Sequence, residues 1–357
     1  MMATLTTQTT AFAMSSALQD LVWSTAETEL HIRISFQQTV SNPVYCLIDT
    51  TLAAVNGQVK LYETRELVER YMRLKGMARM YPLNIQHMEG SAWHTDAVMT
   101  VIFCEKNIVT DDFSQWLEEH FLSTITAKNL PTDENAVEQL FFVQPQGTPP
   151  NPSLHVSYID DSGAVEAEDV EMLANYNPSL TNLFVCEFSL AAIKEAVTAA
   201  SSIIAVTVSV GNRHMEYYRP ARKENVAFRF LNAFNVFESA YLSAVVARKT
   251  EDGRKIARLA GGLAHYDRRP VTEYEVQTAP LSFEEASWID QLVTSPDVRL
   301  LDDTPLIIVD GEALCTNDNA EMNSAKFTYK ERDERHSMAF SPQANIFTVP
   351  PHSYQFS

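Results

Sequence analysis

The sequence predicts a mainly β chain with short helices, an α+β class built from β-sandwich-like domains whose strands are mostly antiparallel. Runs of alternating apolar and polar residues recur along the whole chain, and this period of two is the signature of half-buried strands. β-branched and aromatic residues are concentrated in these runs, where they favour strands. Apolar residues at helical spacing occur only in short segments, so the helices should be few and short.

Length and charge limit the organisation and the partners. A chain of 357 residues predicts two or three packed units. With 45% hydrophobic and 20% charged residues, it has the composition of a globular protein. The net charge of −19 argues against a nucleic-acid partner, because such affinity comes mainly from Lys and Arg that neutralise phosphates. Proteins or neutral surfaces are therefore the expected partners.

Residues 1–24 are rich in Thr, Ala and Ser and are predicted to form a weakly ordered N-terminal arm. This stretch contains no Lys or Arg and no long apolar core, so it does not match a signal peptide. No segment of the chain approaches the roughly 20 apolar residues of a membrane-spanning helix. The sequence therefore predicts no membrane span.

Residues 25–150 are predicted to form a strand-rich domain with two packed helices. Apolar residues at helical spacing predict the helices over 64–76 and 110–122. Alternating or apolar runs predict strands over 29–36, 42–50, 57–63, 97–105 and 138–143. A Pro-rich segment follows the last strand, and its fixed φ angles and missing N–H groups suit a linker. We therefore expect a domain boundary near residue 150.

Residues 151–340 are predicted to form a largely antiparallel β domain. Two alternating runs around residues 160–163 predict a hairpin, and 189–197 reads as a short helix. Further strands are predicted over 202–210, 225–247, 258–267, 272–280, 298–301, 305–313 and 324–333.

The clearest local signal in the chain is a helix over 282–294. Ser282 and Glu285 have the spacing of a capping box, and Pro296 follows the helix as a stop. One apolar stripe should face the core, with Trp288 and Leu292 beside it; its members are Phe283, Ala286, Ile289 and Val293.

Residues 341–357 are predicted to form an extended C-terminal arm. Its prolines keep the chain extended, and three aromatic residues provide anchors for docking along a surface: Phe347, Tyr354 and Phe356. Removal of this arm should leave the body folded but impair oligomerisation.

The four cysteines are Cys46, Cys104, Cys186 and Cys315, and none of them forms a C-x-x-C pair. The apolar runs around Cys46 and Cys104 favour buried free thiols over disulfides or a zinc site. Free thiols fit assembly in a reducing cytoplasm.

No catalytic residue, cofactor or metal site is predicted. The chain lacks the common nucleotide, hydrolase and zincin motifs. His87, Glu89 and His94 match no zinc spacing, and loop histidines are the favoured interpretation. The polar stretch 317–321 lacks the frame of a calcium loop and is predicted to be a turn. The adjacent acid pairs at 160–161 and 302–303 are explained better by turns than by catalysis. The chain is therefore predicted not to be an enzyme.

One basic and aromatic cluster lies around residues 213–223, and its candidate interface residues are Arg213, Tyr217, Tyr218 and Arg219. Tyr and Arg are enriched at interface hot spots, so this cluster is a candidate contact surface. The alternative interpretation is a solvated end of a hairpin whose long side chains reach into water.

Four stretches of the sequence resemble one protein family. They are "VIFCEKNIVTDDFSQWLEEHFLSTITAKNLPTDENAVEQLFFV", "FLNAFNVFESAYLSAV", "YEVQTAPLSFEEASWIDQLVTSPDVRLLD" and "NSAKFTYKERDERHSMAFSPQANIFTVP". These are similar to tail-associated virion structural proteins of Bacteroides-type phages and prophages. The resemblance spans most of residues 40–350, and it implies a role in tail or baseplate architecture without functional residues to transfer.

The expected function is that of a phage virion structural protein, a ring subunit of the tail or baseplate. It would be made in the host cytoplasm and contact copies of itself in a ring-like homo-oligomer as well as other tail proteins. A carbohydrate-binding host-adhesion module is the alternative, and it requires Tyr217, Tyr218 and Trp93 to line an exposed platform. A glycan-cleaving tail enzyme ranks third, and it would need two carboxyl groups facing each other across a cleft.

Overall fold

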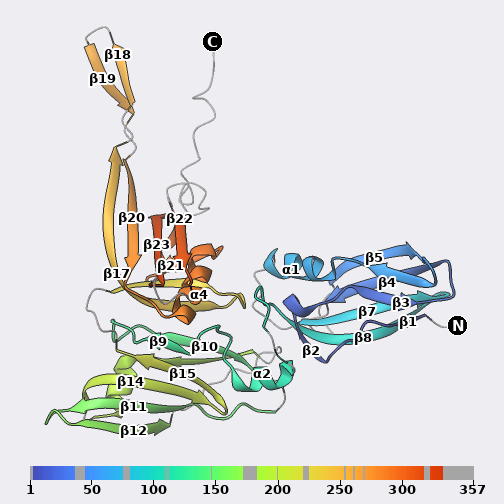
Figure 1. Ribbon diagram of the computed structural model, residues 1–357, viewed down its shortest axis with the longest axis horizontal. Coiled ribbons are helices and arrows are strands. Elements are labelled where there is room, and N and C mark those ends of the chain that lie inside the picture. Colours follow the sequence, from blue (N-terminus) through green and yellow to red (C-terminus); the bar gives the residue numbers. More distant parts are fainter. Residues whose placement is uncertain are drawn as a thin grey trace, which may run out of the picture.

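The computed structural model describes residues 3–36, 45–74, 81–108, 110, 112–145, 147–171, 183–198, 200–219, 225–252, 255–259, 262–267, 270–316 and 322–332. Most of these residues lie in mainly antiparallel sheets joined by short helices, which confirms the predicted fold class. Within them, the buried apolar side chains form three large cores and a smaller cluster. Figure 1 shows the three corresponding units, with the N-terminal unit at the right and the other two stacked at the left.

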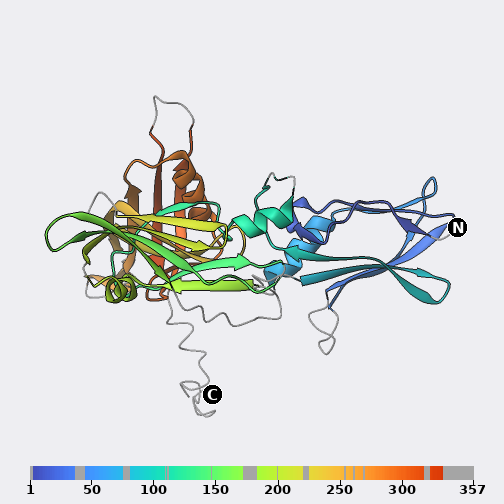
Figure 2. The same ribbon diagram turned by 90° about the horizontal axis from the view of Figure 1, so that it is seen from below.

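The first unit is a sandwich of two sheets around one core. The smaller sheet has the order β1 (Thr4–Leu5), β3 (Leu21–Ser24), β6 (Gln58–Leu61). The larger has the order β2 (Phe12–Met14), β8 (Ala92–Ile102), β7 (Tyr81–Glu89), β4 (Glu29–Phe36), β5 (Tyr45–Ala53). A 3-10 turn (Ser15–Ala17) follows β2, and α1 (Thr64–Leu74) packs against it. Figure 2 shows the length of this sandwich.

The predicted N-terminal arm over 1–24 is wrong for residues 3–24, which belong to this sandwich. β3 pairs with β6, and β2 runs parallel to β8. The Trp23 side chain is fully buried, and its Nε1 atom donates to Oδ2 of Asp96 at 2.9 Å. These strands have only two to four residues. Such short runs are too brief to show a period of two, and their partners lie far along the chain.

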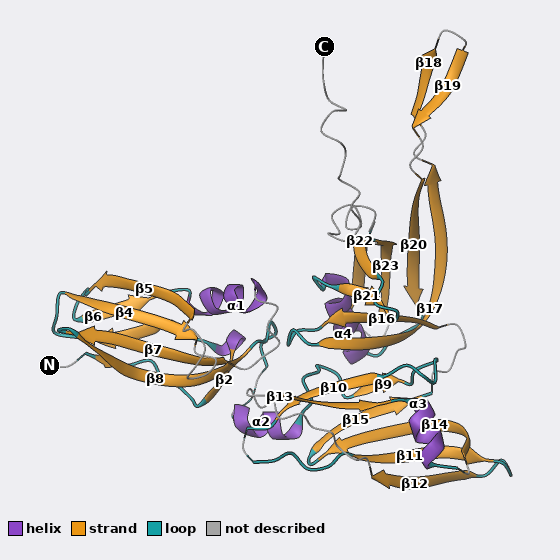
Figure 3. Ribbon diagram, turned by 180° about the vertical axis from the view of Figure 1, so that it is seen from behind, coloured by secondary structure: helices purple, strands orange, loops and turns teal. Residues whose placement is uncertain are grey.

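The second unit is a β-sheet packed against a two-stranded sheet and a helix. The sheet has the order β12 (Val165–Glu171), β11 (Ser153–Asp160), β14 (Ala200–Val210), β15 (Arg213–Tyr218), β9 (Ala127–Asn129). β10 (Glu138–Val143) pairs with β13 (Leu183–Phe188), and α3 (Leu190–Ala196) follows at once. α2 (Phe113–Glu119) lies where the first unit meets this one (Figure 3).

The predicted boundary near residue 150 does not separate two cores. β10 precedes it and pairs along its whole length with β13, while β9 precedes it and pairs in parallel with β15. The sequence around Pro149 reads as a linker because of its prolines, yet here the chain only turns between strands of one unit. The single domain predicted over 151–340 is likewise divided, since the strands after residue 225 enclose a core of their own.

The third unit is a closed barrel with the strand order β16 (Asn225–Leu231), β17 (Phe237–Asp252), β20 (Pro270–Thr278), β23 (Ser324–Glu331), β22 (Pro305–Leu314), β21 (Val298–Leu300). The antiparallel pairing of β21 with β16 closes the ring of strands. Between β17 and β20 the chain forms a second hairpin of β18 (Lys255–Leu259) and β19 (Gly262–Asp267).

α4 (Phe283–Thr294) packs against β22 and β23 and contributes to the barrel core. The predicted capping box is confirmed, because Ser282 Oγ accepts from the Glu285 N–H and the Glu285 carboxylate accepts from the Ser282 N–H. The predicted stripe is only partly right. Ala286 and Ile289 are buried, but Phe283 is 52% exposed and Trp288 is 4% exposed. The buried face is therefore rotated toward Trp288, which packs edge-to-face on Phe230.

A small cluster between the units joins them. It combines side chains from β2, from β8 and α2 and the residues that follow each of them, from β10, and from the loop before β17: Met14, Ile102, Cys104, Leu117, Leu122, Val143, Phe234 and Val236. Backbone contact supports the joint, since the Glu105 N–H donates to the Ala233 carbonyl at 2.9 Å.

Candidate interaction surfaces

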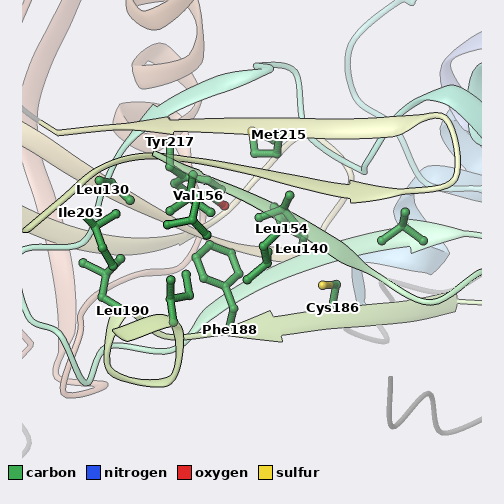
Figure 4. Packing of buried hydrophobic residues seen from close by; sticks show 14 of the residues in the cluster. Leu130, Leu140, Leu154, Val156, Cys186, Phe188, Leu190, Ile203, Met215 and Tyr217 are labelled. Atoms are coloured by element: carbon green, nitrogen blue, oxygen red, sulfur yellow. The ribbon is translucent and has the colours of Figure 1, made fainter. Parts of the chain in front are cut away.

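Two of the four candidate interface residues in the 213–223 cluster are buried inside the chain. Strand β15 alternates, so Arg213, Met215 and Tyr217 face inward and are at most 2% exposed. Figure 4 shows Met215 and Tyr217 among the apolar side chains of the second core. The prediction that Arg213 and Tyr217 contact a partner is therefore wrong. Met215 between them was the signal in the sequence, because residues two apart on a strand share a face.

Arg213 is an internal clamp. Its Nε and Nη2 atoms donate to the Leu117 carbonyl at 2.9 and 2.5 Å, and Nη2 also donates to the Val143 carbonyl at 2.7 Å. Leu117 lies in the last turn of α2, where free carbonyls and the helix dipole favour a cation. The guanidinium also lies 4.9 Å from the centre of the Phe142 ring. One side chain thereby holds α2 and the end of β10 against the β14–β15 hairpin.

Tyr217 belongs to a buried polar network between the second and third units. Its hydroxyl lies 3.3 Å from Oε2 of Glu138, and the Tyr241 hydroxyl on β17 donates to Oε1 of Glu138 at 2.7 Å. Burial raises the pKa of the Glu138 carboxyl, although nearby Lys128 opposes this shift. Burial also raises the pKa of Tyr217 well above its ordinary value, with the Glu138 carboxylate adding to the effect. Burial thus favours the neutral forms of the Glu138 carboxyl and of both phenols at this site.

Glu238 lies in the same network, but its pKa shifts in the opposite direction. Burial alone would raise its pKa, but Lys128 and the hydrogen bonds from Ser123 and Asn232 outweigh burial and lower it. The Ser123 hydroxyl donates to Glu238 at 2.6 Å, and the Asn232 amide donates at 2.9 Å. The network therefore brings Lys128, Glu138 and Glu238 together at the seam between two units, and it shifts the pKa values of the two carboxyl groups in opposite directions.

Tyr218 and Arg219 remain at the surface. Tyr218 is 48% exposed, and its hydroxyl donates to the neighbouring Glu216 carboxylate. Arg219 donates to the Ser202 hydroxyl. Of the four candidate interface residues, these two stay available to a partner. The three tail anchors, Phe347, Tyr354 and Phe356, and the arm over 341–357 lie outside the described residues.

The most prominent exposed feature is a two-stranded ribbon formed by the outer parts of β17 and β20. The two strands pair from Ala244 and Thr278 out to Asp252 and Pro270. β16 accompanies β17 only as far as Ser243. β23 accompanies β20 only over residues 274–277. Figure 1 shows the ribbon rising from the barrel, with β18 and β19 at its far end.

The β17 strand of the ribbon is exposed on both faces over residues 245–250. All of residues 245–250 are exposed, and they include Val245 at 64% and Val246 at 40%. The outer side of the barrel adds two more exposed apolar residues on β22, Ile307 and Val309. Alternation predicts the strands of this region but cannot reveal that a ribbon leaves the barrel, since this depends on where the neighbouring strands end.

A second open edge lies on β12, which pairs only with β11 among the described strands. Every residue from Val165 to Asp169 on this strand is exposed. The strand and its turn carry acidic residues and no Lys or Arg: Asp160, Asp161, Glu166, Glu168, Asp169 and Glu171.

Other residues considered as candidate sites have structural roles in the fold. His87 lies in β7 and is buried, contrary to the predicted loop; its Nδ1 atom lies 2.9 Å from the Asp96 carboxylate. Asp160 and Asp302 accept backbone N–H bonds in their own turns, which confirms the turn interpretation of both acid pairs. The polar stretch 317–321 lies outside the described residues. In the described part of the chain, no group of three or more His, Cys, Asp or Glu residues could hold a metal ion.

The cysteine prediction holds at one of its two positions. Cys104 is buried, whereas Cys46 is exposed on the edge strand β5. Cys186 is buried as well, and Cys315 is exposed. Burial raises the pKa of Cys104 to about 11 and that of Cys186 to about 12. All four are free thiols.

A cavity of about 540 Å³ lies in the first unit beside β2 and α2. Its polar lining consists of Thr and Gln side chains together with backbone, and none of the lining residues titrates. A second cavity of about 200 Å³ lies beside Lys128 and Trp288 at the seam between the other two units. Among the helices in the described ranges, none is both long and apolar enough to cross a membrane.

Comparison with known proteins does not assign the chain to a family. No protein-family model matches the chain, and no curated protein matches it either.

Proposed function

We propose that this chain is a phage virion structural protein, a ring subunit of the tail or baseplate that contacts copies of itself and adjoining tail proteins. The resemblance of four stretches to tail-associated virion proteins supports the phage assignment. The β17–β20 ribbon is the observation that carries the structural role. It provides open strand edges on β17 beyond Ser243 and on β20 before Tyr274, and two exposed apolar side chains, Val245 and Val246, where it leaves the barrel.

A ribbon of this kind implies a partner on energetic grounds. An isolated two-stranded hairpin is at best marginally stable in water. Open edges also present unpaired N–H and C=O groups to other chains, so proteins usually shorten or cover them. Residues 249–252 and 270–273 pair only with one another in the described sheet. A neighbouring subunit that covers the ribbon would satisfy these groups and bury Val245 and Val246.

The buried position of Tyr217 weighs against the carbohydrate-binding alternative. That function requires Tyr217, Tyr218 and Trp93 to form an exposed platform. Tyr217 is fully buried, and Trp93 lies in the first unit beneath the Arg33 guanidinium, 3.9 Å from the ring centre. These aromatic rings do not form a common stacking surface for a sugar.

The proposal is tested by the oligomeric state of the purified chain and of a variant without the ribbon. In this variant an Asn-Gly turn joins Arg248 directly to Tyr274, two residues that already face each other across β17 and β20. We expect closed rings of the full chain in electron microscopy and native mass spectrometry, and a folded variant that no longer forms them. A full chain that stays monomeric would refute the ring proposal.

A second variant that lacks residues 341–357 tests the C-terminal arm separately. We expect it to retain a cooperative unfolding transition and to form rings less readily. Normal assembly of this variant would show that the arm is not an anchor.

A further inference from the structure

We infer that the seam between the second and third units is a latch that opens as the pH rises, while each unit stays folded. The parts that separate are β9 and β10 on one side and β17 on the other. This inference does not depend on the proposed ring. Three observations support it: the polar contacts that cross the seam, the arrangement of charge around Glu138, and a cavity beside the partners of that residue.

Each of the two units keeps its own apolar core, and polar side chains cross the seam between them. Asn129 on β9 donates from Nδ2 to the Tyr241 carbonyl on β17 at 2.7 Å. Arg229 on β16 donates from Nη2 to Oε1 of Gln139 on β10, also at 2.7 Å. Polar contacts between domains allow relative motion, whereas a large hydrophobic interface prevents it. The seam can therefore separate without exposing either core.

Glu138 lies at the centre of this seam and is fully buried. Two phenols contact its carboxyl, with the Tyr241 hydroxyl of the third unit at 2.7 Å and the Tyr217 hydroxyl of the second at 3.3 Å. The other titratable groups that act on it are Lys128 on β9 and Glu238 on β17. These side chains come from β9, β10, β15 and β17. A change in the charge of Glu138 therefore acts on contacts among all four strands.

The charges around Glu138 are balanced only while its carboxyl is neutral. The Nζ atom of Lys128 lies 2.5 Å from Oε1 of Glu238, so this cation already has an anionic partner. When Glu138 loses its proton in the closed seam, two carboxylates face one ammonium group at a position that solvent does not reach. A buried charge without its own partner is strongly unfavourable, whereas the same charge in an open seam is hydrated. Ionisation of Glu138 therefore favours the open seam.

The pH dependence of the latch follows from linkage. Burial raises the pKa of the Glu138 carboxyl, and Lys128 offsets only part of this shift. In the open seam the carboxyl regains its ordinary pKa, so between the two pKa values the closed seam binds more protons than the open one. The equilibrium constant for opening should therefore be constant below the ordinary pKa and should rise about tenfold per pH unit up to the raised pKa.

A cavity gives water a route to this network. It has a volume of about 200 Å³ and is lined by residues of β9, β17 and α4, among them Lys128, Tyr241 and Trp288. Tyr241 also donates to Glu138, so the cavity lies one side chain away from the carboxyl. A separation of β9 from β17 at this place therefore brings water to Glu138.

Thiol labelling at a seam position, followed by mass spectrometry of peptides, tests this inference. Ser239→Cys places a thiol on β17 at a position that is only 8% exposed and contacts Glu138 across the seam. Cys46→Ser with Cys315→Ser removes the exposed thiols. The labelling rate at each pH is divided by the rate of the same chain in urea, which corrects for the fraction of thiolate. We expect this ratio to rise about tenfold per pH unit above the ordinary pKa of Glu. Cys186, which is buried in the second core, should stay unlabelled.

Three further substitutions in the labelled chain show which group controls the latch. Glu138→Gln keeps a neutral side chain at every pH and should abolish the rise. Glu195→Gln on α3 removes a carboxyl at an exposed position and should leave the rise unchanged. Tyr241→Phe should carry the rise to a higher pH, because the hydrogen bond from the Tyr241 hydroxyl lowers the pKa of Glu138.

A labelling ratio that does not change with pH would overturn the latch, and so would a rise of equal size in the Glu138→Gln chain. Labelling of Cys186 together with the seam thiol would show that the second unit unfolds instead, which also overturns it. If the Glu138→Gln chain does not fold, an unchanged upper limit of the rise in the Tyr241→Phe chain has the same consequence.

Discussion

The Lys128 Nζ atom lies 2.5 Å from Oε1 of Glu238, with the two side chains only 2% and 4% exposed. Lys128 belongs to β9 of the second unit and Glu238 to β17 of the third, so this ion pair crosses the seam between two cores. A buried pair of this kind adds little net stability, but the loss of one partner leaves a charge without compensation.

Lys128→Met is therefore expected to lower the free energy of unfolding by about 3–5 kcal/mol. Lys194→Met is the matched control, because Lys194 pairs with Glu134 at the surface and such pairs contribute about 0–1 kcal/mol. Combining Lys128→Met with Glu238→Gln should recover part of the loss. Urea unfolding of the four proteins measures these differences, and equal losses in both lysine variants would contradict a buried pair.

Glu138 should make the protein less stable as the pH rises. Burial raises the pKa of its carboxyl in the folded protein. Between the ordinary Glu pKa and this raised value, the folded chain binds more protons than the unfolded chain. The contribution of Glu138 to stability is thus fully present below the ordinary pKa and is lost as the pH rises through the raised one.

Glu138→Gln keeps a neutral side chain at every pH and should remove this dependence. The measurement is the free energy of unfolding at a series of pH values, compared between the two proteins. Glu195→Gln, at an exposed position on α3, is the control and should follow the unaltered chain. Parallel pH profiles for the Glu138 variant and the unaltered chain would show that this carboxyl ionises normally.

Arg213→Lys tests the internal clamp. Lysine keeps the positive charge but lacks the planar fork that reaches the Leu117 and Val143 carbonyls together. We expect a loss of about 2–4 kcal/mol in the free energy of unfolding, because buried carbonyls lose their donors. Arg219→Lys should change stability by less than about 0.5 kcal/mol, as expected at the surface. A similar effect of both substitutions would argue for an exposed Arg213.

Gly311→Ala should destabilise the barrel. A Cβ atom at Gly311 would lie 2.7 Å from Cβ of Phe327 and 2.9 Å from Cγ1 of Val293. Overpacking of this kind costs about 1–3 kcal/mol, and combining the change with Val293→Ala should relieve one of the two contacts. Ala53→Val adds methyl groups at an exposed position of β5 and serves as the control. An unchanged melting temperature of the Gly311 variant would refute the close approach of α4 and β23 to Gly311 on β22.

The sequence predicts those features that depend on neighbours within a few residues. The capping box of Ser282 and Glu285 is such a feature, and so are the turns at Asp160 and Asp302. Features that depend on distant strands are missed. Trp23 requires Asp96 and β6, and the ribbon requires that the pairing of β16 with β17 end at Ser243. Arg213 and Tyr217 lie between these cases, because the alternation of β15 indicates their direction but composition alone points to a surface.

The cluster that joins the three units bears on how the chain folds during its synthesis. The strands of the first sandwich all precede Cys104, so this unit can form while the ribosome is still translating the rest. The cluster that joins the units can form only after residues 234–236 have been synthesised, because Met14 packs there with Phe234 and Val236. Nascent chains stalled before residue 234 should thus contain a protease-resistant sandwich whose orientation relative to the later strands is not yet set.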